Sequence, residues 1–319
     1  MTTQPMRRAG LDAQVDAPRL AVLIPCYNEA ASVAQTVAAF RAALPQADVF
    51  VYDNASTDKT ADIAREAGAE VRLEPLKGKG NVVRRMFADV EADVYVLVDG
   101  DATYDAASAP SMISKLRDEY LDMVVGAREE TSRDAYRRGH RFGNQLLTGL
   151  VASIFGQGLN DMLSGYRVMS RRFVKSFPAL SQGFEIETEL TVHALEIRAP
   201  VAEVITPYSE RPAGSASKLN TIRDGIRILR MIINLTRDER PLPFFSWLAA
   251  IFAASGILLA APLFAFYLET GLVPRMPTWV LAVSLGMLSA LCLAAGLILD
   301  TVTRGRREMK RLAYLAVSR

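Results

Sequence analysis

The sequence contains few of the residues that build disulfide frameworks and zinc sites. Its 319 residues include only two cysteines and two histidines. Cys26 and Cys292 are far apart, and His140 and His193 are isolated, so neither pair indicates a disulfide framework or a metal centre. The formal net charge is only +2, which gives no general argument for a nucleic-acid partner.

Two familiar signals are also missing. Arg7 and Arg8 lie near the N-terminus, but no apolar stretch of the secretory type follows them. Residues 1–17 therefore read as a flexible polar tail. The Walker motif G-x-x-x-x-G-K-[ST] is absent as well, which excludes a P-loop nucleotide site.

Long uncharged runs are present only near the C-terminus, at Phe244 to Leu268 and at Met276 to Leu299. Each exceeds the roughly 20 residues that a helix needs to cross a bilayer. The alternative is a pair of buried helices in a soluble core. We predict a two-helix transmembrane anchor over 242–300.

Basic residues flank this predicted anchor on both sides, whereas the short loop inside it holds only Glu269 and Arg275. Because Lys and Arg favour the cytoplasmic side, we expect a multi-pass protein of the inner (cytoplasmic) membrane with both termini in the cytoplasm. Residues 301–319 would be a basic cytoplasmic tail. Three glycines, Gly256, Gly286 and Gly296, could pair such anchors into a homo-oligomer.

The part before the anchor alternates between strands and helices. Apolar runs predict strands at 20–25, 48–52, 70–73, 94–98 and 123–126. Helical periodicity predicts helices at 29–44, 57–68 and 81–90, with Ser56 or Thr57 as the N-cap of the second. This alternation predicts an α/β, Rossmann-like domain with a mostly parallel sheet over 18–215.

Polar side chains follow nearly every predicted strand, where α/β sheets bind ligands. Asp99, Gly100 and Asp101 follow the fourth strand, and two carboxylates so close can converge on Mg²⁺ or Mn²⁺. Asp53 ends the second strand and could accept hydrogen bonds from a base or ribose. Lys77 to Gly80 open a helix, whose free N–H groups favour an anion.

These elements together resemble family-2 glycosyltransferases of the GT-A fold, in the polyprenyl-phosphate branch that includes enzymes similar to dolichol-phosphate mannose synthase. Six segments agree with that family in order, over about residues 20–240. They are Ile24 to Glu29, Tyr52 to Asp58, Gly78 to Gly80, Asp99 to Asp101, Ser164 to Arg167, and Arg211 to Leu219.

The resemblance implies a role for each matched residue. The metal would be held by Asp99 and Asp101, and catalysis would rest on these two with Arg128 and Arg167. The donor would be bound by Pro25, Tyr27, Glu29, Asp53, Lys79, Asp99, Gly100, Asp101, Arg211 and Lys218. The acceptor would be bound by Arg141, Asn144, Ser164 and Arg167.

The chain departs from the family pattern at two positions. Thr103 stands where many members have Gln, which leaves a third metal ligand open. Asn54 stands where a second aspartate is commoner. The acidic residues Glu185, Glu187 and Glu189 resemble a family element near the sugar; they would share one face of a strand, whereas a helix would scatter them.

A basic amphipathic helix is predicted over 216–241, with isoleucines and leucines on one stripe and arginines beside it, as in helices on anionic membrane surfaces. A similar stripe begins at Phe142 and could equally pack on the protein core.

A lipid phosphate is already ionised near neutral pH, so it needs no general base to attack the anomeric carbon of the sugar.

The sequence therefore predicts an inverting, metal-dependent transfer of one hexose from a UDP- or GDP-linked sugar to a polyprenyl phosphate. A processive or oligosaccharide-extending synthase is one alternative, although neither Trp247 nor Trp279 lies in a Q-x-x-R-W element. A membrane protein that only binds nucleotide is another. The sequence does not specify the sugar, the base or the polyprenol length.

Overall fold

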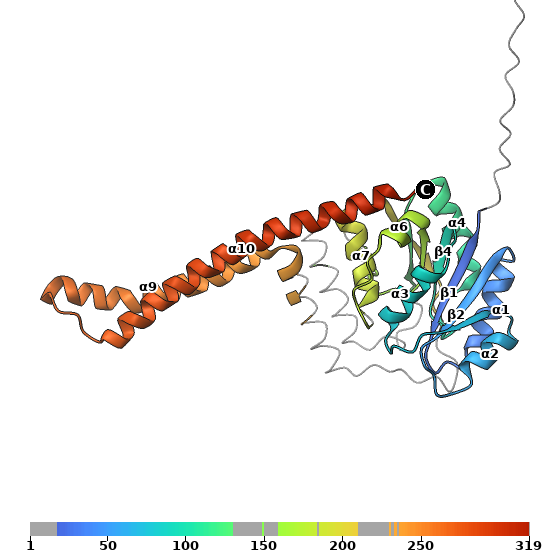
Figure 1. Cartoon of the computed structure of the whole chain (residues 1–319), viewed down its shortest axis with the longest axis horizontal. Coiled ribbons are helices and arrows are strands. Elements are labelled where there is room, and N and C mark those ends of the chain that lie inside the picture. Colours follow the sequence, from blue (N-terminus) through green and yellow to red (C-terminus); the bar gives the residue numbers. More distant parts are fainter. Residues whose placement is uncertain are drawn as a thin grey trace, which may run out of the picture.

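A computed structural model shows an α/β domain from which a long helical hairpin projects (Figure 1). It describes residues 18–129, 149, 159–183, 185–209, 230, 233–234 and 236–318. The predicted tail 1–17 and most of the predicted amphipathic helix 216–241 lie outside these residues.

The domain is built on one seven-stranded sheet of order β3-β2-β1-β4-β6-β5-β7. Its strands are β1 Leu20–Cys26, β2 Ala47–Asp53, β3 Glu70–Leu73, β4 Val94–Leu97, β5 Met123–Arg128, β6 Arg167–Ser170 and β7 Val201–Thr206. Only β6 is antiparallel to its neighbours, β4 and β5. The predicted mostly parallel α/β fold is confirmed.

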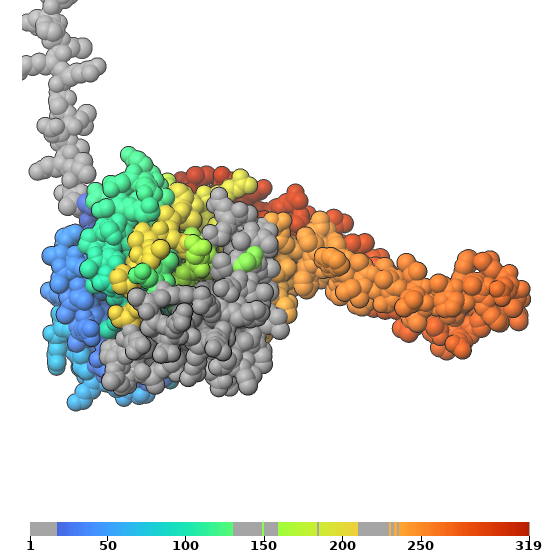
Figure 2. Space-filling model, turned by 180° about the vertical axis from the view of Figure 1, so that it is seen from behind, coloured from blue at the N-terminus to red at the C-terminus, as the bar shows by residue number. Residues whose placement is uncertain are grey.

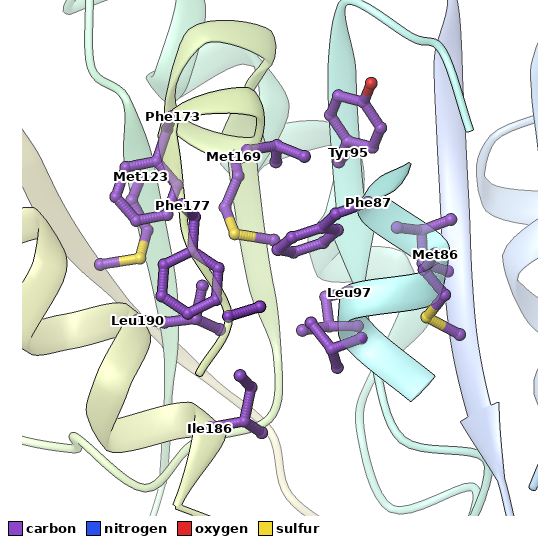
Figure 3. Packing of buried hydrophobic residues seen from close by; sticks show 14 of the residues in the cluster. Met86, Phe87, Tyr95, Leu97, Met123, Met169, Phe173, Phe177, Ile186 and Leu190 are labelled. Carbon is purple, nitrogen blue, oxygen red and sulfur yellow. The ribbon is translucent and has the colours of Figure 1, made fainter. Parts of the chain in front are cut away.

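Helices cover both faces of this sheet. They are α1 Val33–Ala43, α2 Thr60–Glu66, α3 Lys79–Asp89, the 3-10 turn η1 Ala106–Ser108, α4 Ala109–Asp118, α6 Arg171–Ser176 and α7 Ile186–Ile197. Alternate residues of β1 point to opposite faces: Leu23 joins the core under α3, α6 and α7, whereas Val22 and Ile24 join the core under α1 and α4. Figure 3 shows the first core, where the Phe177 ring lies near both Phe87 of α3 and Phe173 of α6.

The predicted strands lie at β1 to β5, but two predicted helices begin later than expected. The N-cap of α2 is Lys59, not Ser56 or Thr57. The reason is that Ser56 Oγ accepts a hydrogen bond from the backbone N–H of Asn28, and Thr57 donates to Asn28 Oδ1. These residues tie two loops together rather than capping the helix.

The two uncharged runs form the helices α9 Pro241–Thr270 and α10 Met276–Ala316, which pack against each other as a hairpin. Both are long and apolar enough to cross a membrane, and only 17% of the most apolar window of each is buried. The hairpin extends beyond the domain in both views (Figures 1 and 2). The core helices of a soluble protein would be mostly buried, so that alternative does not fit.

Helix α10 does not end at residue 300, where we predicted the tail to begin. It continues to Ala316 and reaches the α/β domain, where Tyr314 joins the core beneath α3, α6 and α7. The predicted basic tail is thus a docked helix up to Ala316. Two of the glycines that we expected to pair neighbouring anchors, Gly256 and Gly296, instead face the partner helix of the same hairpin.

Candidate functional site

The site begins where β1 and β2 end side by side. Pro25 of β1 lies opposite Tyr52, and Cys26 opposite Asp53. The loop after β1 is tied to the segment after β2, because the backbone N–H of Glu29 donates to Thr60 Oγ1 at 2.8 Å. The Tyr27 ring lies 5.4 Å from the ammonium of Lys77. Both segments are thereby held at the edge where parallel sheets bind ligands.

Asp53 is a buried carboxylate with an unsatisfied oxygen. The side chain is 5% exposed, and Oδ2 accepts from the backbone N–H of Ser56 at 3.2 Å. Its other oxygen, Oδ1, has no hydrogen-bond partner among the described residues. Buried acceptors are normally satisfied, so Oδ1 is available to a donor group of a ligand. The role predicted for Asp53 in holding a nucleoside stays a prediction.

The carboxylates Asp99 and Asp101 follow β4. The Asp99 side chain is 30% exposed, whereas Asp101 is 4% exposed. Thr103 donates its hydroxyl to Asp101 Oδ1 at 2.6 Å. The hydroxyl group of Thr103 therefore orients Asp101. As a threonine, Thr103 offers no carboxylate or amide oxygen as a third metal ligand.

Gly100 lies between these carboxylates, and its backbone is held in place by hydrogen bonds. Its carbonyl oxygen accepts from Ser32 Oγ at 2.8 Å and from Thr36 Oγ1 at 3.3 Å. A Cβ at Gly100 would overlap Cys26 Sγ. Burial, followed by the surrounding carboxylates, raises the pKa of the Cys26 thiol well above its ordinary value. Cys26 is therefore a packing residue beneath the carboxylate pair.

Lys79 places a positive charge directly beside the carboxylates of the site. Its ammonium contacts Asp99 Oδ1 and also Glu187 Oε1 at 2.5 Å, and its side chain is 9% exposed. Burial alone would lower the pKa of Lys79, but the charges of Asp99 and Glu187 outweigh it and raise the pKa above the ordinary value. Lys79 thus stays protonated, and the carboxylates around it are arranged to hold positive charge.

This donor set fits a hard divalent ion. Asp99 and Asp101 offer carboxylate oxygens, the ligand type that Mg²⁺ and Mn²⁺ prefer. Asp99 already holds a cationic ammonium. Within the described residues no cluster of three or more His, Cys, Asp or Glu side chains suits a metal. Further ligands would then come from substrate phosphates or water, as is common for Mg²⁺.

Glu187 was not singled out from its two acidic neighbours by the sequence. The segment is helical, as the start of α7, so the strand alternative is wrong. Only Glu187 reaches Lys79; Glu189 accepts from the backbone N–H groups of Leu180 and Ser181. Burial raises the pKa of Glu187, and Lys79 partly offsets this. Lys79 and Glu187 are 108 positions apart in the sequence, so no local pattern could reveal the pair.

Arg128 is held by a carboxylate. Its Nε and Nη2 each donate to Asp161 at 2.7 Å, a bidentate pair. Burial would raise the pKa of Asp161, but the hydrogen bonds from Arg128 lower it overall. The guanidinium also lies over the Tyr208 ring, at 5.6 Å. The catalytic role that the resemblance implies for Arg128 stays a prediction.

Ser164 and Arg167 lie inside the domain, at the start of β6. Both are fully buried. Ser164 donates to the carbonyl of Gly126 at 2.6 Å, and Arg167 donates to the carbonyl of Met162 at 2.7 Å. Burial lowers the pKa of Arg167 to about 10. Their side chains thus tie β6 and the loop before it to neighbouring segments. The contact with a sugar or acceptor that the resemblance implies for Ser164 and Arg167 stays a prediction.

Gly165, between these two residues, is the one that faces the site. A Cβ there would lie 2.6 Å from Asp99 Oδ2. Its backbone N–H donates to Tyr104 Oη at 2.9 Å. The absence of a side chain at Gly165 therefore leaves room for the Asp99 carboxylate. Four other predicted site residues lie outside the described residues: Arg141, Asn144, Arg211 and Lys218.

Comparison with known proteins agrees with this geometry. The family model described as "Glycosyl transferase family 2" matches residues 21–177. Protein RfbJ of Shigella flexneri is 57% identical over 123 residues, which cover 38% of this chain and 95% of RfbJ. Glycosyltransferase AglJ of Haloferax volcanii is 36% identical over 241 residues, covering 75% of this chain and 79% of AglJ.

Two further matches bear on the branch and the fold. A dolichyl-phosphate hexose transferase of Haloferax volcanii is 29% identical over 222 residues, covering 69% of this chain and 95% of that protein. Glucosyl-3-phosphoglycerate synthase of Mycobacterium tuberculosis, solved with Mn²⁺, uridine diphosphate and glucosyl-3-phosphoglycerate, has a TM-score of 0.58 at 21% identity. That match covers 73% of this chain and 85% of the synthase chain. At that identity the likeness concerns the fold.

Proposed function

The chain belongs to glycosyltransferase family 2, and from that premise we propose that it transfers a single hexose from a nucleotide-diphosphate sugar to a polyprenyl phosphate. The reaction would take place at the cytoplasmic face of the inner membrane, with inversion at the anomeric carbon and a divalent ion in the site. The donor would be a UDP- or GDP-linked sugar.

The helical hairpin is the observation that carries the lipid acceptor. Its two helices are apolar, largely exposed and continuous with the catalytic domain. Exposed apolar surface on this scale is unfavourable in water, and a bilayer would cover it. An enzyme anchored there meets a lipid phosphate at the membrane surface. A relative named dolichyl-phosphate hexose transferase adds support.

The donor would lie along the ends of β1, β2 and β4. Asp53 Oδ1 would accept a hydrogen bond from the base or ribose, and Tyr27 would offer its ring. Lys79 would hold positive charge close to the diphosphate, because it lies beside Asp99 and stays protonated.

Asp99 and Asp101 would hold Mg²⁺ or Mn²⁺. When bound, such an ion neutralises negative charge that develops on the leaving diphosphate. Thr103 keeps Asp101 oriented through its hydroxyl, and the absence of a side chain at Gly165 keeps the space beside Asp99 open. These residues prepare the geometry before substrate arrives.

The acceptor would need no general base, since a phosphate monoester is largely ionised near neutral pH. Glu187 fits this proposal, because Lys79 engages one of its oxygens as an ion-pair partner. Basic residues on both sides of the hairpin would keep the catalytic domain and both termini in the cytoplasm. Pairing of two chains through the exposed faces of the hairpin remains part of the proposal.

The test is transfer from a panel of radiolabelled UDP- and GDP-sugars to polyprenyl phosphate in liposomes. We expect one donor to yield a glycosylated lipid, and a chelator to stop the reaction. Asp101→Asn should reduce the rate at least about 100-fold, since even outer-shell changes at metal sites typically cost 10–100-fold.

The exposed Asp118→Asn variant, at the end of α4, is the matched control and should retain full activity. Full turnover with a chelator present would refute the metal. Transfer only to water-soluble acceptors, such as phosphoglycerate, would refute the lipid acceptor.

A further inference from the structure

Asn54 directly follows β2, at a position where aspartate is commoner in the family that the sequence resembles. It is 5% exposed. Its backbone N–H donates to the carbonyl of Cys26 at 2.8 Å, which fixes it at the junction of β1 and β2. The proposed reaction assigns no role to this residue.

The side-chain amide of Asn54 makes three hydrogen bonds to one segment, residues 74–78. Nδ2 donates to the carbonyl of Glu74 at 2.9 Å and to the carbonyl of Leu76 at 2.7 Å. Oδ1 accepts from the backbone N–H of Gly78 at 2.7 Å. An amide has two N–H donors and one carbonyl acceptor, so both donors and the acceptor are used here. A carboxylate has no donor to offer the two carbonyls.

The segment that Asn54 holds carries the cations of the site. Lys77 lies over the Tyr27 ring, and Lys79 lies between Asp99 and Glu187. Gly78, with φ at +126°, turns the chain into α3. The backbone N–H of Gly80 donates to the carbonyl of Gln182 on the far side. Asn54 is thus the attachment of this segment to the sheet.

We propose that Asn54 is a positioning residue, which sets the affinity for the nucleotide-sugar donor by holding Lys77 and Lys79 at the sheet edge. This inference rests on the proposed function only for the identity of the donor. Its physical basis is that the Asn54 amide donates to two backbone carbonyls and accepts from one backbone N–H. An ionised aspartate at this position could accept but could not donate.

The decisive variant is Asn54→Asp. Its carboxylate would keep the acceptor for Gly78 but face the carbonyls of Glu74 and Leu76 with no proton. We expect the donor KM to rise about tenfold at about pH 8, with kcat changed less than about threefold, as a lost pair of buried hydrogen bonds implies. Burial raises the pKa of a carboxyl group, so a proton would return to it as the pH falls to about 6 and restore one donor.

The kcat/KM of Asn54→Asp relative to the unchanged protein should therefore rise as the pH is lowered. Gln35→Glu, the same amide-to-carboxylate change on the exposed face of α1, is the matched control and should give a flat ratio. A flat ratio for Asn54→Asp as well, or a loss confined to kcat, would overturn the proposal.

Hydrogen exchange of the resting protein supplies a readout that needs no substrate. Amides of residues 76–80 should exchange faster in Asn54→Asp at about pH 8 than in the unchanged protein, and the difference should narrow towards about pH 6. If no nucleotide-sugar is turned over by any variant, the proposed function fails while this exchange result still decides the role of Asn54. Unchanged exchange would overturn that role.

Discussion

At the scale of single residues, the site depends on one ammonium shared by two carboxylates. Lys79, Asp99 and Glu187 come from α3, the end of β4 and α7, and the Lys79 and Glu187 side chains are less than 10% exposed. Removing one partner of a buried ion pair leaves an uncompensated charge, which typically costs 3–5 kcal/mol. The same negative charge would attract a divalent ion.

Lys79→Met should lower the thermal midpoint in the absence of metal, because Asp99 and Glu187 would then repel each other in a buried setting. Added Mn²⁺ should raise that midpoint more in Lys79→Met than in the unchanged protein, since a ligand that binds only the folded state stabilises it. Differential scanning fluorimetry with a Mn²⁺ titration measures both effects.

Lys115→Met is the matched control, because Lys115 forms a more exposed helical pair with Glu119. Such pairs contribute about 0–1 kcal/mol, so the midpoint should barely move. An equal response to Mn²⁺ in Lys79→Met and in the unchanged protein would contradict a cation site formed by these carboxylates.

At the scale of elements, the site exists because parallel strands end at one edge and α3 starts there. The start of α3 packs directly on a backbone segment: a Cβ on Gly80 would overlap the carbonyl of Ser181. That segment is held in turn by Glu189 of α7, which accepts from Leu180 and Ser181. The start of α3 therefore approaches the loop before α7 through backbone, and only glycine permits so close an approach.

Gly80→Ala should destabilise the protein by about 1–3 kcal/mol, the usual cost of overpacking, and should reduce activity by moving Lys79. Gly305→Ala is the matched control. Gly305 lies in α10 with open space around its Cβ position, and alanine there should stabilise the helix by up to about 1 kcal/mol. Denaturant unfolding measures the stability of both variants. Similar unfolding midpoints for Gly80→Ala and Gly305→Ala would show that the close approach at Gly80 is not maintained in solution.

At the scale of the whole molecule, the C-terminal part of α10 joins the helical hairpin to the α/β domain. Tyr314 donates to Asp122 and lies beneath Arg172, whose guanidinium is 4.8 Å from the ring. Lys310 pairs with Glu196 of α7 at 2.5 Å. In the proposed membrane-bound protein, a helix held in this way would fix how the site faces the bilayer, which a flexible tail could not do.

Tyr314→Phe should lower the free energy of unfolding by about 1.5–3 kcal/mol at neutral pH, the range for hydrogen bonds to charged groups. Burial would raise the pKa of Asp122, but hydrogen bonds from Arg172, Ser170 and Tyr314 lower it overall. The stability from this carboxylate is thus present above its unfolded pKa of about 3.9 and is lost as the pH falls through its lower folded value.

The difference in the free energy of unfolding between Tyr314→Phe and the unchanged protein should therefore persist from neutral pH down to about pH 4. It should shrink only below that pH. Tyr120→Phe, at a position 70% exposed, is the control and should lower the free energy of unfolding less, because water can replace any partner of so exposed a hydroxyl group. A Tyr314→Phe protein as stable as the unchanged one at neutral pH would mean that the end of α10 is not docked.

Glu196, at the same contact between α10 and the α/β domain, makes stability depend on pH in the opposite direction. Burial and the nearby Glu239 raise its pKa to about 7. A raised folded pKa contributes stability that is complete below the unfolded value of about 4.3 and is lost as the pH rises towards 7. The thermal midpoint should therefore fall over this range, and Glu196→Gln should flatten that fall.

Glu66→Gln, at the exposed end of α2, is the control for removing a carboxylate and should leave the slope unchanged. A midpoint in Glu196→Gln that keeps the slope of the unchanged protein would assign the pH dependence to another group.

The sequence by itself determined the class of fold, the family, the carboxylate pair and the two apolar helices. Each of these is encoded locally: apolar runs make strands, Asp99 and Asp101 are two residues apart, and an uncharged run needs no partner to be recognised. Even the departure at Asn54 was visible before the structure.

Only the tertiary structure decided which of these residues act together. It paired Lys79 with Glu187, buried Ser164 and Arg167, and joined Tyr314 to Asp122 across 192 positions of sequence. The physical reason is that burial and ion pairing depend on which side chains packing brings into contact. Glu185, Glu187 and Glu189 are chemically alike in the sequence, and the turn of α7 alone brings Glu187 to Lys79.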